Sequence, residues 1–300
     1  MSARLLEGKH IAAALRKEIK AEVEELMRLG IVPGLTMIRV GQDPASITYM
    51  NAKAKSSEEV GVRSAIVELP RDCREEQIAT LLGEIGRDTS IHGVIVQLPL
   101  PPHLDVLRVL SLMNPEKDVD GFHPINVGRL SMGEPLFVPA TPMGIKELLD
   151  RSDVSVEGAH VVIVGRSMIV GKPLANYLSL KKPGLNATVT LCHSSSTNLE
   201  KITRSADILV SAVGRAEFVR ASMVSPGAVV VDVGMNRIDD PSTPTGNRLV
   251  GDVKFDEVSE IASAITPVPG GVGPMTVAML LRNTVEACRM QTGDRNEHVR

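Results

Sequence analysis

Residues 159–178, AHVVIVGRSMIVGKPLANYL, constrain the fold of this chain more than any other stretch. They open with four consecutive apolar β-branched residues, which is typical of a strand buried in a parallel sheet. Gly165 ends that run, and apolar residues at helical spacing follow Gly171 and Pro173. A strand, a glycine turn and a helix start predict the first βα unit of a dinucleotide-binding fold. The glycine spacing differs from G-x-G-x-x-G, so the stretch alone also fits a βα turn of any α/β protein.

The composition fits a globular enzyme. With 300 residues, of which 43% are hydrophobic and 23% charged, we expect two domains or one large one. The net charge is −3, no dense basic block occurs and only 2% of the residues are aromatic, so we expect no nucleic-acid partner. The scattered cysteines show neither metal nor disulfide spacing, which predicts no metal site and favours a reducing, cytoplasmic location. No signal peptide or membrane-length apolar run is visible, so we expect no membrane partner.

The first half of the chain alternates between two hydrophobic periodicities. Apolar residues at helical spacing alternate with short β-branched runs that end at Gly or Pro. The pattern predicts helices over 7–29, 43–59, 74–85 and 104–113, and strands over 35–40, 64–69 and 93–98. Strands that alternate with helices indicate a parallel sheet, whose ligands bind at the carboxyl ends of the strands.

Three polar side chains share one face of the predicted helix after Asp43. Ser46, Tyr49 and Lys53 lie three and four residues apart, so a hydroxyl, a phenol and an amine stack along the helix. Lys53 can act as a base if its pKa is lowered. The alternative is a solvated lysine beside a packed tyrosine.

Two further groups lie where such a sheet places its ligands. Gln97 lies at the carboxyl end of the predicted strand over 93–98, where its amide can bond an amine or tie down its own loop. Asp118 and Asp120 precede Gly121 in an acidic loop, which either binds a polar heterocycle or is merely a turn.

The second half supplies the nucleotide-binding signals. Residues 122–142 are rich in Gly and Pro and mark a domain junction; strands are predicted over 187–194, 207–210 and 229–233. His193 and three serines stand where NAD-binding folds usually carry a carboxylate for the ribose 2′-hydroxyl, and Arg166 is available from the first turn. These features predict a 2′-phosphate, hence NADP. Residues 266–276, with three glycines and three prolines, predict a rigid loop before a helix over 277–290; the loop suits a flat ring or a phosphate.

Five segments together resemble the bifunctional methylenetetrahydrofolate dehydrogenase/methenyltetrahydrofolate cyclohydrolase family. They are 46–55 (SITYMNAKAK), 92–100 (HGVIVQLPL), 115–121 (PEKDVDG), 164–173 (VGRSMIVGKP) and 266–276 (TPVPGGVGPMT). The resemblance implies two α/β domains around a cleft, the second a Rossmann-like doubly wound parallel sheet. Residues 1–140, joined by a C-terminal helix over 275–290, would form the folate-binding catalytic domain, and 141–274 the NADP-binding domain.

The resemblance also implies the roles of single residues, a homodimer and tetrahydrofolate derivatives as substrates. Its catalytic group is Lys53, Tyr49, Gln97 and Asp120, and its substrate contacts are Ser46, Pro267, Gly270 and Gly271. Its NADP contacts are Gly165, Arg166, Ser167, Gly171, Ser194 and Thr276. We expect the strand over 229–233 to contribute to the dimer. An NADP-dependent shikimate-type dehydrogenase would not explain Tyr49, Lys53 and Gln97 together, and a non-catalytic dinucleotide sensor would bind NADP without acting on folate.

Overall fold

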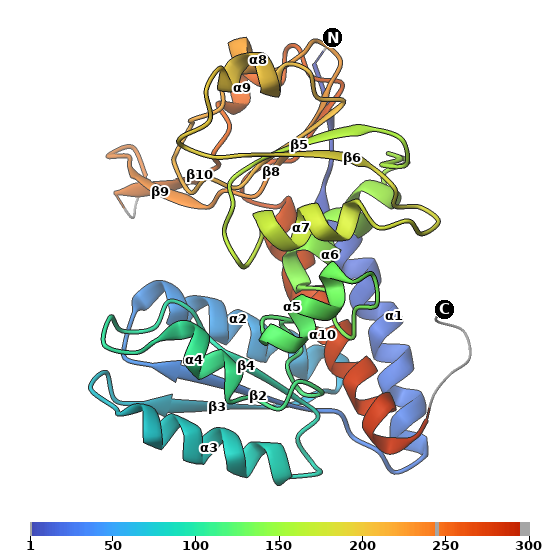
Figure 1. Cartoon of the computed structure of the whole chain (residues 1–300), viewed down its shortest axis with the longest axis vertical. Coiled ribbons are helices and arrows are strands. Elements are labelled where there is room, and N and C mark those ends of the chain that lie inside the picture. The colour runs from blue at the N-terminus through green and yellow to red at the C-terminus, as the bar shows by residue number, and fades with distance from the viewer. Residues whose placement is uncertain (1, 244–245, 295–300) are drawn as a thin grey trace. The chain divides into compact units, whose positions relative to one another are not determined.

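The chain forms two compact units, described here from a computed structural model for residues 2–243 and 246–294 (Figure 1). The three-stranded unit comprises Ala13–Ala140 and Val277–Arg300, and the six-stranded unit comprises Met1–Ala12 and Thr141–Thr276. The chain passes between the units within helix α1 (Gly8–Arg28), at the start of α6 (Ala140–Asp150) and within α10 (Val272–Thr292).

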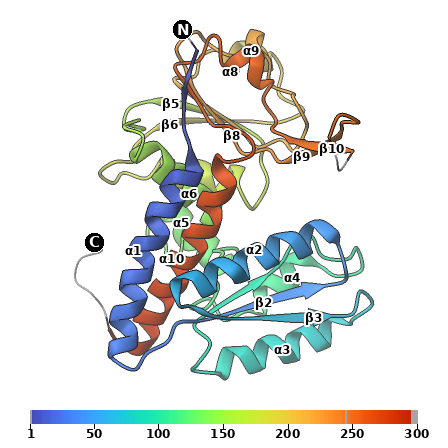
Figure 2. The same cartoon turned by 180° about the vertical axis from the view of Figure 1, so that it is seen from behind.

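The three-stranded unit is built on a parallel sheet in the order β3-β2-β4. Helix α2 lies on one face of this sheet and α3 on the other (Figures 1 and 2). The elements are β2 (Gly34–Val40), α2 (Pro44–Val60), β3 (Arg63–Leu69), α3 (Glu75–Arg87), β4 (Gly93–Val96), α4 (Val106–Ser111) and α5 (Pro124–Ser131). The predicted α/β class with a parallel sheet is therefore confirmed.

Local sequence signals define both ends of α2. The Asp43 carboxylate accepts the Ser46 N–H at 2.8 Å as the N-cap, and Pro44 occupies the first turn, where a missing N–H costs nothing. Gly61 ends the helix in the left-handed region at φ 84°. These caps fix where the helix begins and ends, and the burial of Ser46, Lys53 and Ser57 shows which face is turned inward.

Helices α1 and α10 lie side by side within the three-stranded unit (Figure 2). The predicted apolar stripe of α1 is buried at Leu15, Ile19, Val23 and Leu26. Arg289 of α10 lies 3.6 Å from Glu22 and 3.7 Å from Glu25 of α1, and Arg282 lies 3.3 Å from Glu18. Ion pairs thus link the two helices, and the apolar stripe of α1 is buried within the unit.

The six-stranded unit contains a fully parallel sheet in the order β1-β11-β8-β7-β5-β6. Its strands are β1 (Arg4–Leu5), β5 (His160–Val164), β6 (Thr188–Cys192), β7 (Ile208–Ser211), β8 (Val229–Asp232) and β11 (Ala264–Ile265). After β6 the chain returns to the other side of β5 to form β7, which makes the carboxyl end of β5 a topological switch point. The predicted Rossmann-like sheet is confirmed, and its switch point is where a dinucleotide site is expected.

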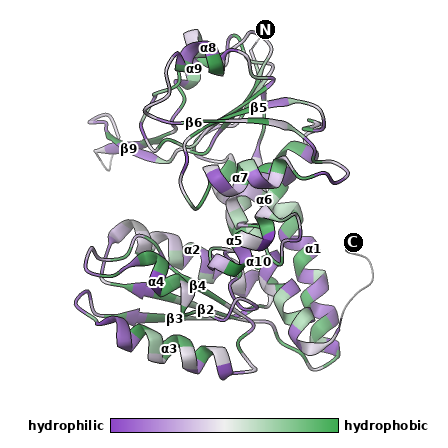
Figure 3. Ribbon diagram, viewed as in Figure 1, coloured by the Kyte–Doolittle hydropathy of each residue, from purple (hydrophilic) through white to green (hydrophobic). Residues whose placement is uncertain are grey.

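Helices cover both faces of this sheet, with α7 (Gly171–Leu178) on one face and α8 (Leu199–Thr203) and α9 (Phe255–Val258) on the other (Figure 1). Val162, Val164 and Leu209 are buried in one apolar cluster, against which Leu199 and Ile202 of α8 pack. The apolar residues of these strands can be followed by hydropathy in Figure 3. A 3₁₀ turn (Ala221–Met223) and the antiparallel pair β9 (Asn236–Asp239) and β10 (Asn247–Val250) complete the unit.

The structure differs from the sequence prediction mainly at short elements and at one helix start. Strands β1, β9, β10 and β11 and helices α5, α8 and α9 were not expected, because two to eight residues carry too little periodicity. Helix α10 begins at Val272 instead of 277. Pro274 is tolerated there because a first-turn N–H has no partner within the helix. In the described ranges, no helix combines the length and apolar character needed to cross a membrane.

Candidate functional site

A buried lysine in the three-stranded unit meets an amide from a neighbouring element. Lys53 of α2 is 7% exposed, and its Nζ donates a hydrogen bond to Gln97 Oε1 at 3.2 Å. The ring of Tyr49, one helical turn earlier, has its centroid 5.9 Å from the same Nζ. Ser46 is buried at the start of this helix face. The structure therefore brings Gln97 into contact with the row that carries Tyr49 and Lys53, as the resemblance implied.

Gln97 is held by bonds to β2 and to its own loop. Its backbone N–H donates to the Ile38 carbonyl at 2.8 Å, and its side-chain Nε2 donates to the Leu98 carbonyl at 2.8 Å. With Nε2 engaged, Oε1 is the atom left to face Lys53. Both interpretations raised for Gln97 are therefore correct, because the amide ties down its loop and holds the amine. It does so without adding a charge.

Burial is the main influence on the titrating groups of this site. Burial lowers the pKa of Lys53, and the nearby Asp120 carboxylate opposes that shift. Burial raises the pKa of Asp120, and Lys53 opposes that shift in turn. Burial also raises the pKa of Tyr49, so its phenol stays protonated at neutral pH. A lysine whose pKa is lowered, beside a neutral amide and a phenol, is suited to accept a proton.

The two carboxylates of the acidic loop, Asp118 and Asp120, have different roles. Asp118 is fully buried, and its Oδ2 accepts the His123 N–H at 2.7 Å and the Asn126 Nδ2–H at 2.8 Å. Burial raises the pKa of Asp118 to about 6. Asp118 thus anchors the loop, while Asp120 interacts electrostatically with Lys53. Sequence analysis did not single out Asn126, which lies in a helix too short to predict.

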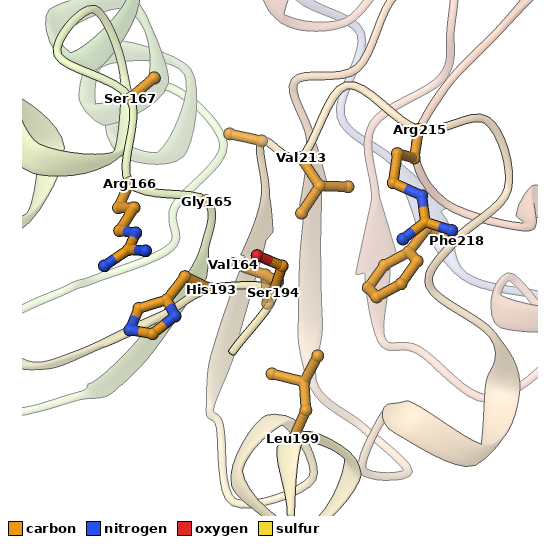
Figure 4. A pocket seen from close by; sticks show the side chains of 11 residues that line it. Val164, Gly165, Arg166, Ser167, His193, Ser194, Leu199, Val213, Arg215 and Phe218 are labelled. Carbon is orange, nitrogen blue, oxygen red and sulfur yellow. The ribbon is translucent and has the colours of Figure 1, made fainter. Parts of the chain in front are cut away.

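A pocket of about 250 Å³ lies in the six-stranded unit at the carboxyl ends of β5, β6 and β7 (Figure 4). Arg166 and His193 lie on one side of it, and Arg215 and Phe218 on the other. Its lining comprises Val164, Gly165, Arg166, Ser167, His193, Ser194, Leu199, Ala212, Val213, Arg215 and Phe218. The sequence predicted Gly165, Arg166, Ser167 and Ser194; the wall after β7 was missed, although Gly214 marked its turn.

The pocket lining fits a phosphorylated dinucleotide. Arg166 and Arg215 supply cations, Ser167 and Ser194 supply hydroxyls, and none of the lining residues is acidic. Apolar side chains in the same lining can contact a flat ring. In the described part of the chain, no three His, Cys, Asp or Glu side chains are grouped as metal ligands would be.

Two glycines make the turn at this pocket possible. Gly165 has φ 124°, and a Cβ there would lie 2.1 Å from the Ala212 carbonyl oxygen. A Cβ at Gly171 would lie 1.9 Å from the Gly165 carbonyl oxygen. Gly171 does not line the pocket; it allows α7 to begin against the strand turn, where the Ser167 hydroxyl accepts the Val170 N–H at 3.2 Å.

The glycine- and proline-rich loop lies elsewhere in the six-stranded unit. The Gly270 carbonyl accepts the Lys9 N–H at 2.8 Å, and the Thr276 hydroxyl lies 3.0 Å from that of Thr141. Pro267, Gly270, Gly271 and Thr276 are absent from the pocket lining. Their proposed contacts with substrate and cofactor stay predictions.

Comparisons with known proteins match this chain over nearly its full length. The family models "Tetrahydrofolate dehydrogenase/cyclohydrolase, catalytic domain" and "NAD(P)-binding domain" match residues 6–120 and 139–292. The bifunctional protein FolD of Dehalococcoides mccartyi is 53% identical over 98% of this chain and 99% of its own length. The bifunctional enzyme FolD of Campylobacter jejuni has TM-score 0.90 at 43% identity, covering 96% of this chain and 99% of that one. The Trypanosoma brucei FolD complexed with NADP and inhibitor has TM-score 0.92 at 41% identity, covering 97% and 99%.

Proposed function

The chain belongs to the tetrahydrofolate dehydrogenase/cyclohydrolase family, and from this membership we infer the reactions that its two sites perform. It oxidises 5,10-methylenetetrahydrofolate to 5,10-methenyltetrahydrofolate with NADP, and it hydrolyses the latter to 10-formyltetrahydrofolate. The observation that carries the assignment is the contact between Lys53 and Gln97, because a buried amine held by a neutral amide suits hydrolysis of a cationic substrate. A shikimate-type dehydrogenase would not explain Tyr49, Lys53 and Gln97 together.

In the dehydrogenase reaction, the residues of the six-stranded unit bind and orient the cofactor. NADP, when bound, supplies the acceptor for the hydride that leaves the folate. Arg166 and Ser194 would hold the 2′-phosphate. The turn at Gly165 would let the protein backbone approach the pyrophosphate of the dinucleotide. Hydride transfer needs this positioning of the two reactants, and it needs no acid or base from the protein.

In the cyclohydrolase reaction, Lys53 acts first as the proton acceptor and then as the proton donor. Water adds to the methenyl carbon, and the neutral Lys53 amine accepts a proton from it. That proton returns to the ring nitrogen as the carbon–nitrogen bond breaks, and the second water proton leaves to solvent. Gln97 holds the amine in place, and the Asp120 carboxylate offsets the positive charge of the substrate.

Incubation with 5,10-methylenetetrahydrofolate and either NADP or NAD tests this function. We expect NADP to be reduced and methenyltetrahydrofolate to form and decay, both followed by absorbance. Methenyltetrahydrofolate added alone should be hydrolysed without any nicotinamide cofactor. Binding of NADPH without any folate-dependent absorbance change would instead identify a dinucleotide sensor and exclude the proposed enzyme.

We also propose that the chain forms a homodimer through the edge of its six-stranded sheet. The suggested strand over 229–233 is unsuitable, because β8 lies between β11 and β7 and its Val230 and Val231 are fully buried within the unit. Strand β6 pairs only with β5 in the described residues, and its Leu191 is 36% exposed. Light scattering should report a dimer at micromolar concentration, and Leu191→Arg should favour the monomer. A monomeric wild-type protein would refute the proposal.

A further inference from the structure

One buried carboxylate receives hydrogen bonds from three consecutive backbone amides. Asp252 is 0% exposed, and its Oδ2 accepts the N–H groups of Val213 at 2.7 Å and Gly214 at 3.0 Å. Its Oδ1 accepts the N–H of Arg215 at 2.9 Å and the Nδ2–H of Asn236 at 2.9 Å. Both oxygens are therefore engaged twice, and three of the four donors come from one loop. Such a set of bonds holds residues 213–215 in one conformation.

The loop held by Asp252 forms a wall of the nucleotide pocket. Val213 and Arg215 line the pocket, whereas Asp252 does not. The Arg215 guanidinium lies 5.0 Å from the ring centroid of Phe218, another lining residue, so both side chains belong to the same wall (Figure 4). The shape of this wall depends on a carboxylate that has no surface in the pocket.

The backbone at Asp252 is hydrogen-bonded to a second buried carboxylate, that of Asp232. Its N–H donates to Asp232 Oδ1 at 2.8 Å, and the Val253 N–H donates to Asp232 Oδ2 at 2.9 Å. Glycine backbone lies close against both carboxylates, because a Cβ at Gly234 would lie 2.3 Å from Asp252 Oδ1 and one at Gly251 would lie 1.7 Å from Asp232 Oδ2. The backbone at Asp252 is therefore held in place by Asp232.

We propose that Asp252 is a positioning residue for NADP, acting through the backbone of residues 213–215. The proposal rests on the proposed function only in taking NADP as the ligand of the pocket. An Asn side chain at position 252 cannot replace the carboxylate, since either orientation turns its NH₂ group toward N–H donors. We expect the loop to lose its conformation and the pocket to lose affinity for the nucleotide.

Asp252→Asn tests this proposal through binding, backbone exchange and both activities. NADPH affinity, measured by fluorescence titration without folate, should fall by about 10-fold or more, as expected when a buried hydrogen-bond set is left unpaired. Amides 213–215 should exchange hydrogen faster in the nucleotide-free protein. KM for NADP should rise, whereas kcat for hydrolysis of methenyltetrahydrofolate, which needs no nucleotide, should stay unchanged.

Asp207→Asn makes the same chemical change at an exposed carboxylate of the same unit and serves as a control. The Asp207 Oδ2 accepts the His160 N–H at 2.8 Å at the amino end of β5, far along the strand from the pocket. This variant should keep the NADPH affinity of the wild-type protein. Asn236→Ala, which leaves both buried carboxylates in place, should weaken NADPH binding less than Asp252→Asn but in the same direction.

Several outcomes would overturn the positioning role. Wild-type NADPH affinity in both Asp252→Asn and Asn236→Ala would do so. So would equal losses of NADPH affinity and cyclohydrolase kcat in Asp252→Asn, because a general structural role predicts them. If Asp252→Asn fails to fold, unchanged binding and amide exchange in Asn236→Ala are sufficient to reject the proposal. A wild-type protein that does not bind NADPH would refute the proposed function instead.

Discussion

Lys53→Met is expected to abolish cyclohydrolase activity while part of the dehydrogenase turnover survives. Losing a general base typically costs about 10²- to 10⁴-fold in rate, whereas hydride transfer needs no titrating group. Met keeps an unbranched side chain in a buried site and preserves the tendency of α2 to be helical. Methenyltetrahydrofolate should therefore accumulate during the dehydrogenase reaction, which absorbance measures directly.

The pH profile of the wild-type protein should identify the same group. The proposed base is the neutral amine, so cyclohydrolase kcat should rise with pH and level off above the pKa of Lys53. Burial lowers this pKa from 10.5, and a cationic substrate lowers it further, while the Asp120 carboxylate opposes both. The rising limb should thus lie below the ordinary range of lysine. It should be absent from the residual activity of Lys53→Met.

Lys55→Met provides the matched control for this experiment. Lys55 is exposed on the same helix, two residues after Lys53, and should tolerate the change with both activities intact. If Lys53→Met hydrolyses methenyltetrahydrofolate at the wild-type rate, Lys53 is not the base. The proton acceptor must then be another group, and the lowered pKa of Lys53 has no catalytic meaning.

Arg166→Ala should weaken the binding of NADP much more than the binding of NAD. NAD has no 2′-phosphate and so cannot make the charge-assisted bond with the Arg166 guanidinium. Loss of a hydrogen bond to a charged group corresponds to roughly 10- to 100-fold in affinity, and the exposure of Arg166 favours the lower end. KM for NADP should rise accordingly, and KM for NAD should change little. Steady-state kinetics with both cofactors measure the difference.

Arg215→Ala separates this specific contact from general electrostatic attraction. Arg215 carries the same charge on the opposite wall of the same pocket. Removing the Arg215 side chain should lower the affinities for NADP and NAD by similar factors, because Arg215 is not assigned to the 2′-phosphate. Equal losses of both cofactors in Arg166→Ala would contradict the assignment of Arg166 and with it the basis for the NADP preference.

Local sequence patterns determined most of the fold and the chemical types at the site. Helix and strand periodicities, together with the Gly and Pro that end each run, predicted the alternating elements and hence parallel sheets. The turn at Gly165 predicted the nucleotide site, because only glycine fits that backbone conformation against the Ala212 carbonyl. The spacing of Tyr49 and Lys53 predicted their shared face, since helical geometry is repeated locally.

The tertiary structure decided how these groups contact one another and what holds them in place. The residue pattern left two interpretations of Gln97 open, and the family resemblance placed it with Lys53. The fold shows both contacts, because the loop after β4 lies against α2 although Lys53 and Gln97 are 44 residues apart. It also assigns Asp118 to the loop and Asp120 to Lys53, two acids that look alike in the chain. Asp252 lies 37 to 39 residues from the amides it holds. Such contacts depend on how distant elements pack against one another, and local sequence patterns do not predict that packing.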